Sequence, residues 1–326
     1  MTADTEREGL LLAGKVAVVT GAGRGLGRAY ATALAAVGAA VVVNDIDEDA
    51  AQSVVASINA GSALSAGPST PAGSTEARAR GTAVAEPGAV GSAEVADALV
   101  RRAVAEFGRL DVMCTNAGVL RDRTLRNTTD EDFDLVLRTH LRGTFTCGRA
   151  AFLRFREQGG GGRLILVGSP AGQRASFGQT AYTAAKAAIV GVTRTWAVEG
   201  ERQGTTVNAV IPTALTRMVA TIPGLEEAVA RAEAGEPVPP ELRQRGLGSP
   251  DDVAPLVVFL ASDESAGVTG QCIGAGGDRL VLWSHPTEVA AAGRTGGWTV
   301  DAVRRHFADA FASQLQEFRP PPRESS

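Results

Sequence analysis

A short strand pattern, a glycine-rich turn and a helix follow one another near the start of the sequence, and this order restricts the fold more than any other feature. Residues 16–20 are apolar or β-branched and too few for a helix, so they predict a buried strand that ends at Gly21. A helix is expected over 25–37, and a second buried strand over 41–45. Two strands joined by a helix begin a parallel sheet.

The same alternation continues along the chain. Further strands are expected near 82–85, 111–115, 164–167, 207–211 and 271–275, with helices over 48–60, 92–107, 129–156, 180–202 and 251–261. Strands that alternate with helices form a sheet covered on both faces. The predicted fold class is therefore α/β, a doubly wound parallel (Rossmann) sheet of about seven strands.

Two segments interrupt this pattern, and one extends it. Residues 61–81 are rich in Gly, Ser, Pro and Ala and predict a flexible surface insertion. Residues 213–248 loosen into short helices and loops after a sheet strand, where we expect them to cover the substrate. A single domain is expected over 10–277, followed by a C-terminal extension over 278–326.

Charge and cysteine content exclude several classes of protein. A net charge of −4 and a pI near 5.6 argue against a nucleic-acid or anionic-membrane surface. The three cysteines, Cys114, Cys147 and Cys272, lie far apart and indicate neither a metal site nor a disulfide framework. No signal peptide or membrane span is recognisable, so a cytoplasmic location is expected.

The glycine-rich turn predicts a dinucleotide site. Glycines let the backbone approach a phosphate, and the following helix supplies free N–H groups. The residues expected at this turn are Gly21, Arg24, Gly25, Leu26 and Gly27. Asp45 ends the second strand, where a carboxylate accepts hydrogen bonds from ribose hydroxyls and repels a 2′-phosphate. NAD is therefore expected over NADP, with a helix-capping role for Asp45 as the alternative.

A tyrosine and a lysine one helical turn apart predict proton transfer. Tyr182 and Lys186 lie at the start of an apolar helix, and Ser169 follows a predicted strand. An ammonium group near a phenol lowers the phenol pKa, while a serine hydroxyl can bind a substrate oxygen. Only two tyrosines and two lysines occur in the chain, and one of each falls in this pair.

Four motifs together resemble the short-chain dehydrogenase/reductase family over residues 15–277. They are the glycine turn at 20–27, Asn116-Ala117-Gly118, Ser169, and the Tyr182 to Lys186 pair. The resemblance implies that Tyr182 is the acid/base, that Lys186 also binds nicotinamide ribose, and that Ser169 orients a carbonyl. It also implies that Asn116, Ala117 and Gly118 support the sheet beside the cofactor.

A narrower likeness points to a substrate. Residues 120–123, 140–143, 177–179 and 254–257 resemble the 3-hydroxyacyl-CoA dehydrogenase part of peroxisomal multifunctional enzymes and its bacterial relatives. Arg121 and Arg123 then become candidate contacts to a carrier phosphate, the alternative being a solvated loop.

Three positions depart from the wider family. His140 replaces a catalytic asparagine and either holds a proton-relay water or packs in the helix. Residues 86–88 lack the usual adenine-binding aspartate, and Pro212 is followed by Thr213 instead of glycine beside the nicotinamide end.

The expected protein is an NAD-dependent oxidoreductase that interconverts a secondary alcohol and a ketone, namely a 3-hydroxyacyl-CoA and its 3-oxoacyl-CoA. A hydroxysteroid or polyketide-type ketone reductase is one alternative, and a non-catalytic nucleotide-sensing protein is another. The long helices over 129–156 and 180–202 resemble those through which family members form homodimers and homotetramers, so a homo-oligomer is expected.

Overall fold

The computed structural model describes residues 10–61, 81–222 and 224–315. Most of the predicted insertion at 61–81 lies outside the described residues. The chain divides into two compact units, Met1–Leu282 and Trp283–Ser326. The domain boundary expected at 277 and the covering role of 213–248 remain predictions.

One sheet of eight strands forms the centre of the first unit. The strands are β1 Val16–Val19, β2 Ala40–Val43, β3 Ala83–Ala85, β4 Val112–Thr115, β5 Arg163–Val167, β6 Thr206–Pro212, β7 Cys272–Gly276 and β8 Arg279–Trp283. Their order is β3-β2-β1-β4-β5-β6-β7-β8, and β1 to β7 pair in parallel. The α/β prediction is confirmed. The order reverses between β1 and β4, the place where doubly wound sheets bind ligands.

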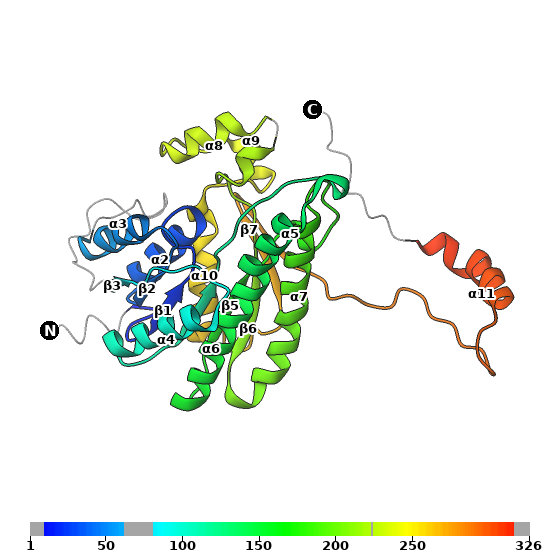
Figure 1. Cartoon of the computed structure of the whole chain (residues 1–326), viewed down its shortest axis with the longest axis horizontal. Helices are drawn as coiled ribbons and strands as arrows, with labels where there is room; N and C mark the ends of the chain where they lie inside the picture. Colours follow the sequence, from blue (N-terminus) through cyan, green and yellow to red (C-terminus); the bar gives the residue numbers. More distant parts are fainter. Residues whose placement is uncertain (1–9, 62–80, 223, 316–326) are drawn as a thin grey trace. The chain divides into compact units, whose positions relative to one another are not determined.

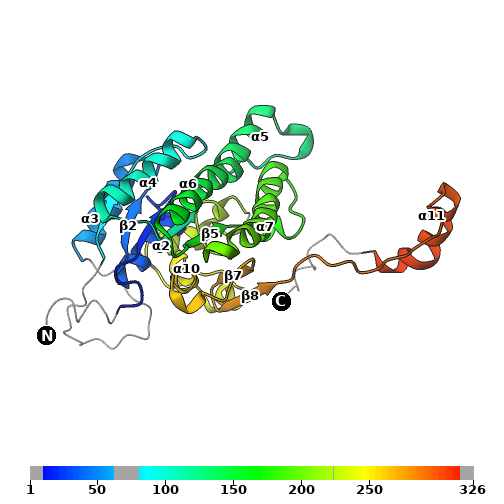
Figure 2. The same cartoon turned by 90° about the horizontal axis from the view of Figure 1, so that it is seen from below.

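Helices cover both faces of this sheet (Figure 1). They are α2 Gly25–Ala36, α3 Glu48–Asn59, α4 Ala93–Phe107, α5 Asp130–Leu137, α6 Gly143–Gln158, α7 Thr180–Gly200 and α10 Ala254–Ala261. Ala17 and Val19 of β1 pack in the core with α2, α3 and α10, whereas Val16 and Val18 pack with α4, α6 and α7. Figure 2 shows α10 on the opposite side of the sheet from α4 and α6. Alternate strand residues therefore bury both faces.

Two elements differ from the sequence prediction. The helix expected over 129–156 contains a π turn at Arg138–Arg142, between α5 and α6. Such a turn adds a residue to the helical repeat and is common at functional sites. The eighth strand, β8, was not predicted, because its residues follow the turn Gly276 to Asp278 and were assigned to the extension.

The segment after β6 forms a small structure with its own apolar cluster. It contains α8 Glu226–Glu233 and α9 Pro240–Gln244. Leu215, Val229 and Val238 are buried together there, apart from the two sheet cores. The two ends of the segment pair through Ala214 and Gly248. Because it starts where β6 ends, this segment lies at the carboxyl edge of the sheet, and Figure 1 shows α8 and α9 there.

The second unit contains the helix α11 Val300–His306. Thr299 is its N-cap, and the Thr299 hydroxyl accepts a hydrogen bond from the Ala302 N–H. Across the described part of the chain, no helix has both the length and the apolar content to cross a membrane.

Candidate active site

The glycine-rich turn between β1 and α2 leaves no room for a side chain at Gly21 or Gly27. A Cβ atom on Gly21 would lie 2.7 Å from the Ala117 Cα, and one on Gly27 would lie 2.2 Å from the Gly21 carbonyl oxygen. Gly21 and Gly25 have φ values of 62° and 53°, which favour glycine. The turn therefore needs these glycines to place its backbone at the start of α2.

Asn116 connects the turn to the end of β4. Its Nδ2 donates to the carbonyl oxygens of Thr20 and Gly21 at 3.0 and 3.1 Å. The Thr20 hydroxyl oxygen in turn accepts from the N–H groups of Asn116 and Ala117 at 2.9 and 3.1 Å. These bonds hold the carboxyl ends of the two strands together at the point where the strand order reverses.

Asp45 is buried at the end of β2 and faces the glycine turn. One carboxylate oxygen accepts from the Gly23 N–H at 2.9 Å, and the other accepts from the Asp47 N–H at 3.1 Å. The N-cap of α3 is Asp47, whose side chain accepts from the Ala50 N–H. Asp47 also forms an ion pair with Arg24 of the turn. The capping alternative raised for Asp45 thus describes Asp47 instead.

Asn44 was not identified from the sequence. It is buried at the end of β2, and its Nδ2 donates to the carbonyl oxygens of Glu86 and Gly88, both at 3.0 Å. Asn44 thereby shapes the segment after β3 that replaces the usual adenine-binding aspartate. The available signal was a polar residue directly after four apolar strand positions.

The second group of residues gathers where β5 ends and α7 begins. Lys186 is buried, and its Nζ donates to the Val167 carbonyl at 2.6 Å. The same Nζ lies 5.7 Å from the centre of the Tyr182 ring. Ser169 is buried after β5, and its hydroxyl also accepts from the Ala171 N–H. Residues from one strand end and one helix start are therefore brought together as the sequence predicted.

Burial dominates the ionisation of the tyrosine and lysine. It lowers the pKa of Lys186 to about 7. It also raises the pKa of Tyr182, which a hydrogen bond with Ser169 opposes and the charge of Asp122 reinforces. The sequence argument predicted a lowered phenol pKa near the lysine. In this structure the desolvation of Tyr182 is the larger effect, so the phenol is protonated at neutral pH.

His140 lies in the π turn and contacts Tyr182 on one side and the segment after β4 on the other. Its ring packs edge-on against Tyr182 at 5.2 Å, and its Nε2 lies 3.0 Å from the Val119 N and 2.8 Å from the Val119 O. A Cβ atom on Gly118 would lie 2.3 Å from the ring. Burial, with the charge of Lys186, lowers the pKa of His140 to about 3, so the ring is neutral.

The Nδ1 of His140 is buried without a hydrogen-bond partner among the described residues. The backbone contacts of Nε2 fit a packed histidine, while a buried Nδ1 without a partner fits a bound water. Both alternatives from the sequence thus keep a structural basis.

Arg121 and Arg123 lie beside this group but already have an acidic partner. Their Nε atoms are 3.3 and 3.8 Å from the carboxylate of Asp132 in the first turn of α5. Pro212 ends β6 at the same edge of the sheet, and the Thr213 N–H donates to the Ala275 carbonyl at 3.0 Å.

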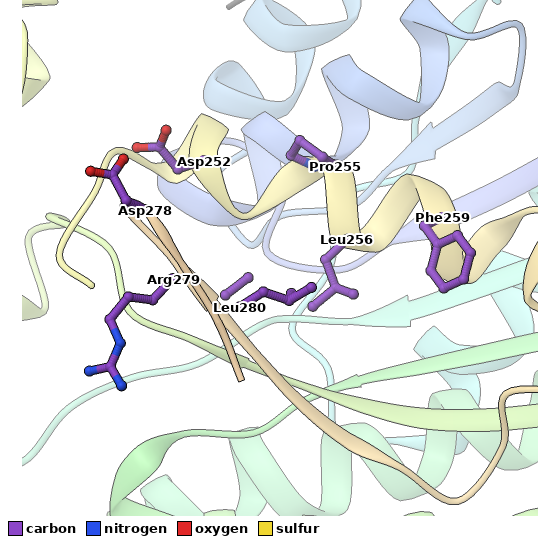
Figure 3. Close-up of a pocket in the computed structure, with 9 residues that line it drawn as sticks. Asp252, Pro255, Leu256, Phe259, Asp278, Arg279 and Leu280 are labelled. Carbon is purple, nitrogen blue, oxygen red and sulfur yellow. The ribbon is translucent and has the colours of Figure 1, made fainter. Parts of the chain in front are cut away.

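A pocket of about 450 Å³ lies elsewhere, between α10 and the β7–β8 turn. Figure 3 shows Leu256 and Leu280 in its apolar part, with Asp252 and Asp278 at one end. Pro255 and Leu256 of the 254–257 segment line it, whereas the glycine turn and the group of Ser169, Tyr182 and Lys186 do not. Among the described residues, no group of three or more His, Cys, Asp or Glu could hold a metal ion.

Comparisons with known proteins agree with this geometry. The family model described as enoyl-(acyl carrier protein) reductase matches residues 21–277. The crystal structure of a short chain dehydrogenase from Mycobacterium avium is similar with a TM-score of 0.75 at 35% identity, over 96% of this chain and 98% of that chain.

Two curated relatives carry names that state a chemistry. Peroxisomal multifunctional enzyme type 2 of Mus musculus is 36% identical over 306 residues, which are 90% of this chain and 36% of that protein. A hydroxyacyl-CoA dehydrogenase of Mycobacterium tuberculosis is 40% identical over 283 residues, which are 84% of this chain and 81% of that protein. The chain spans only 36, 27 and 32% of three longer peroxisomal relatives.

Proposed function

Because the chain belongs to the short-chain dehydrogenase/reductase family and is an oxidoreductase, we propose that it oxidises a 3-hydroxyacyl-CoA to the 3-oxoacyl-CoA with NAD. The observation that carries this proposal is the group formed by Ser169, Tyr182 and Lys186 where β5 ends and α7 begins, together with a turn that has no room for side chains at Gly21 and Gly27. An alcohol dehydrogenase needs a proton acceptor at the hydroxyl and a hydride acceptor at the adjacent carbon.

The residues around the glycine turn fit a nicotinamide dinucleotide. The turn at 21–27 places backbone N–H groups and the start of α2 where a pyrophosphate would bind. Asp45 would hold the adenosine ribose, and the backbone at 86–88 would line the adenine. Asn116 to Gly118, Tyr182, Lys186 and Pro212 would contact the nicotinamide half. When bound, the cofactor supplies the hydride acceptor.

The buried carboxylate of Asp45 supports the choice of NAD. Replacing Asp45 with serine is expected to lower kcat/KM for NAD and to raise it for NADP, because the substitution removes both the ribose contact and the repulsion of a 2′-phosphate. The check is kcat/KM for both cofactors in parent and variant. A parent enzyme that already prefers NADP would contradict the role of Asp45.

The side chains of this chain divide the chemistry among them. Ser169 would hold the substrate oxygen, and the Tyr182 oxygen would accept the hydroxyl proton during alcohol oxidation. Lys186, when protonated, favours the phenolate and donates to the nicotinamide ribose. His140, neutral throughout, either holds a relay water through Nδ1 or orders the Val119 backbone. In ketone reduction the same proton returns from Tyr182 to the oxygen.

The choice of an acyl-CoA is supported by the hydroxyacyl-CoA dehydrogenase relative. The segment 213–248 is long enough to cover an acyl chain and carries its own apolar cluster. Arg121 and Arg123 remain candidates for a carrier phosphate, which would have to compete with Asp132 for them.

A single comparison of substrates tests this choice. We expect 3-hydroxyacyl-CoA esters to give a higher kcat/KM than a 17-hydroxysteroid under one condition, because contacts to the remote carrier can orient the reacting carbon. If the free steroid wins, the acyl-CoA proposal is wrong and the hydroxysteroid alternative takes its place. NAD binding without turnover of any alcohol or ketone would instead support the nucleotide-sensing alternative.

We also propose a homodimer or homotetramer formed through α5, α6 and α7. Phe145 and Leu153 of α6 are 43% and 50% exposed, and Val198 of α7 is 75% exposed. A surface pocket of about 510 Å³ opens between Leu137, Leu141 and Val192 on the same helices. Phe145 also lines this pocket, and exposed apolar side chains on these helices favour a protein interface. A cytoplasmic location stays a prediction.

A further inference from the structure

The glycine turn carries one arginine, beside the residue proposed to hold the adenosine ribose. Arg24 is the N-cap of α2, and the N–H of its neighbour Gly23 donates to the Asp45 carboxylate at 2.9 Å. A phosphate on the 2′-oxygen of that ribose would therefore lie near Arg24. A guanidinium in such a place binds a 2′-phosphate through charge-assisted hydrogen bonds. Arg24 taken alone thus favours NADP, whereas Asp45 favours NAD.

Asp47 holds this arginine. Its Oδ2 forms an ion pair with the Arg24 Nη2, and the two side chains are 45% and 44% exposed. The other oxygen of the same carboxylate, Oδ1, accepts from the Ala50 N–H at 3.1 Å and caps α3. The Asp47 N–H donates to Asp45 at 3.1 Å. The guanidinium is thus paired with a carboxylate that the start of α3 keeps in place.

The fixed position of Asp47 makes it an effective competitor for Arg24. An ion pair between two mobile, half-exposed side chains is weak, partly because both side chains lose conformational freedom when they pair. The Asp47 carboxylate has already lost much of that freedom, because the Ala50 N–H holds it. The hydrogen bond from Ala50 and the guanidinium of Arg24 also lower the pKa of Asp47, so its carboxylate is charged at neutral pH.

We propose that Asp47 is a specificity-determining residue that withholds Arg24 from a 2′-phosphate. The inference rests on the proposed function, in which NAD is the cofactor, and it divides the choice of NAD between two aspartates. Asp45 repels the phosphate directly, while Asp47 occupies the guanidinium of the turn that would otherwise bind it. Replacing Asp45 alone leaves Arg24 paired, so NADP binding should then improve only in part.

The test compares four proteins, namely the parent, Asp45→Ser, Asp47→Asn and the double variant. Calorimetry measures the Kd of NAD and of NADP without any alcohol substrate. The two dinucleotides differ only in the 2′-phosphate, so the ratio of their Kd values isolates the contribution of that group. In the double variant this ratio should shift toward NADP by about tenfold more than the product of the two single shifts, which is the effect of one hydrogen bond to a charged group.

The choice of asparagine keeps the fold of α3. Asparagine is as good an N-cap as aspartate, so Asp47→Asn still has an acceptor for the Ala50 N–H but no charge for Arg24. Asp47→Ser has the same two properties and provides a second variant if the first one unfolds. Thermal unfolding of both variants should stay close to that of the parent.

Two controls identify the cause of the shift. Arg24→Gln, added to the double variant, should remove the tenfold excess, because the guanidinium is the group that the second substitution releases. Asp49→Asn removes another exposed charge from the first turn of α3. Asp49 forms no ion pair with Arg24 in the described part of the chain. Together with Asp45→Ser, it should therefore give the same ratio as Asp45→Ser alone.

The outcomes separate this inference from the proposed function. If the two single shifts simply multiply, Asp47 does not withhold Arg24, and the inference is wrong while NAD remains the proposed cofactor. An excess that survives Arg24→Gln, or that Asp49→Asn reproduces, overturns it as well. A parent that binds NADP more tightly than NAD, or binds neither, contradicts the cofactor of the proposed function and this inference with it. A substrate other than 3-hydroxyacyl-CoA would leave all these Kd values unchanged.

Discussion

Replacing Tyr182 with phenylalanine is expected to lower kcat by about 10²- to 10⁴-fold while the affinity for NAD changes little. The phenol hydroxyl is the group proposed to exchange a proton with the substrate, and it forms a hydrogen bond with Ser169, which is proposed to hold the substrate oxygen. The aromatic ring, which packs against His140, remains in the variant, so the fold of this region should persist. Steady-state turnover and NAD titration measure the two effects separately.

Tyr30 provides the matched control, because it is the other tyrosine of the chain. It is fully buried in the core of α2, and its hydroxyl has no hydrogen-bond partner among the described residues. Tyr30→Phe removes the same hydroxyl group from the hydrophobic core, away from the candidate active site, and should leave turnover within a few-fold of the parent. If Tyr182→Phe also stays in that range, the acid/base assignment is wrong.

The sequence was sufficient for features that depend on local physics. Short strands of three to seven mostly buried residues and the helices between them are recognisable because each must bury apolar side chains on both faces of the sheet. The glycine turn is recognisable because a backbone close to Ala117 and to α2 admits no Cβ atom. Tyr182 and Lys186 share a helix face, so their proximity also followed from spacing.

Contacts between distant segments could not be predicted in this way. Arg121 and Arg123 form ion pairs with Asp132, and Asp122 accepts a hydrogen bond from Gln179. These contacts depend on how the loops after β4 and β5 meet. The π turn at His140 depends on the packing of α5 and α6 against their neighbours. Likewise, the raised pKa of Tyr182 reflects burial, which a residue pattern does not contain.

The two lysines illustrate the same difference. A chain that uses arginine almost everywhere retains Lys15 and Lys186. Lys15 is half-exposed and pairs with Asp263 at 3.0 Å, a contact that an arginine could also make. Lys186 is buried, and the loss of hydration lowers its pKa to about 7, which a guanidinium would not allow. Structure, rather than composition, shows which lysine has a property that arginine lacks.

Replacing Lys186 with methionine is expected to reduce turnover by about 10²-fold or more, because the variant loses the charge proposed to favour the phenolate and the proposed donor to the nicotinamide ribose. Its effect on stability should depend on pH. In the folded state the pKa of Lys186 is about 7, whereas in the unfolded chain it has its usual value of 10.5. Between these two pH values the Lys186 side chain is protonated in the unfolded chain but not in the folded protein. This residue therefore makes the free energy of unfolding of the parent increase with pH over that range.

The methionine variant lacks this pH dependence of stability. The difference in Tm between variant and parent should therefore change with pH in one direction. Below pH 7 the parent must keep an ammonium group buried, so the variant should be most favoured there, and its Tm relative to the parent should fall by about 5 °C between pH 7 and pH 9. The unsatisfied Val167 carbonyl destabilises the variant equally at every pH, so it changes the offset and not the slope. Lys15→Met is the control, since Lys15 is half-exposed and paired, and should show turnover and a pH dependence of Tm close to those of the parent. A constant Tm difference across this range for Lys186→Met would mean that the buried lysine keeps its proton, which would contradict the lowered pKa of Lys186.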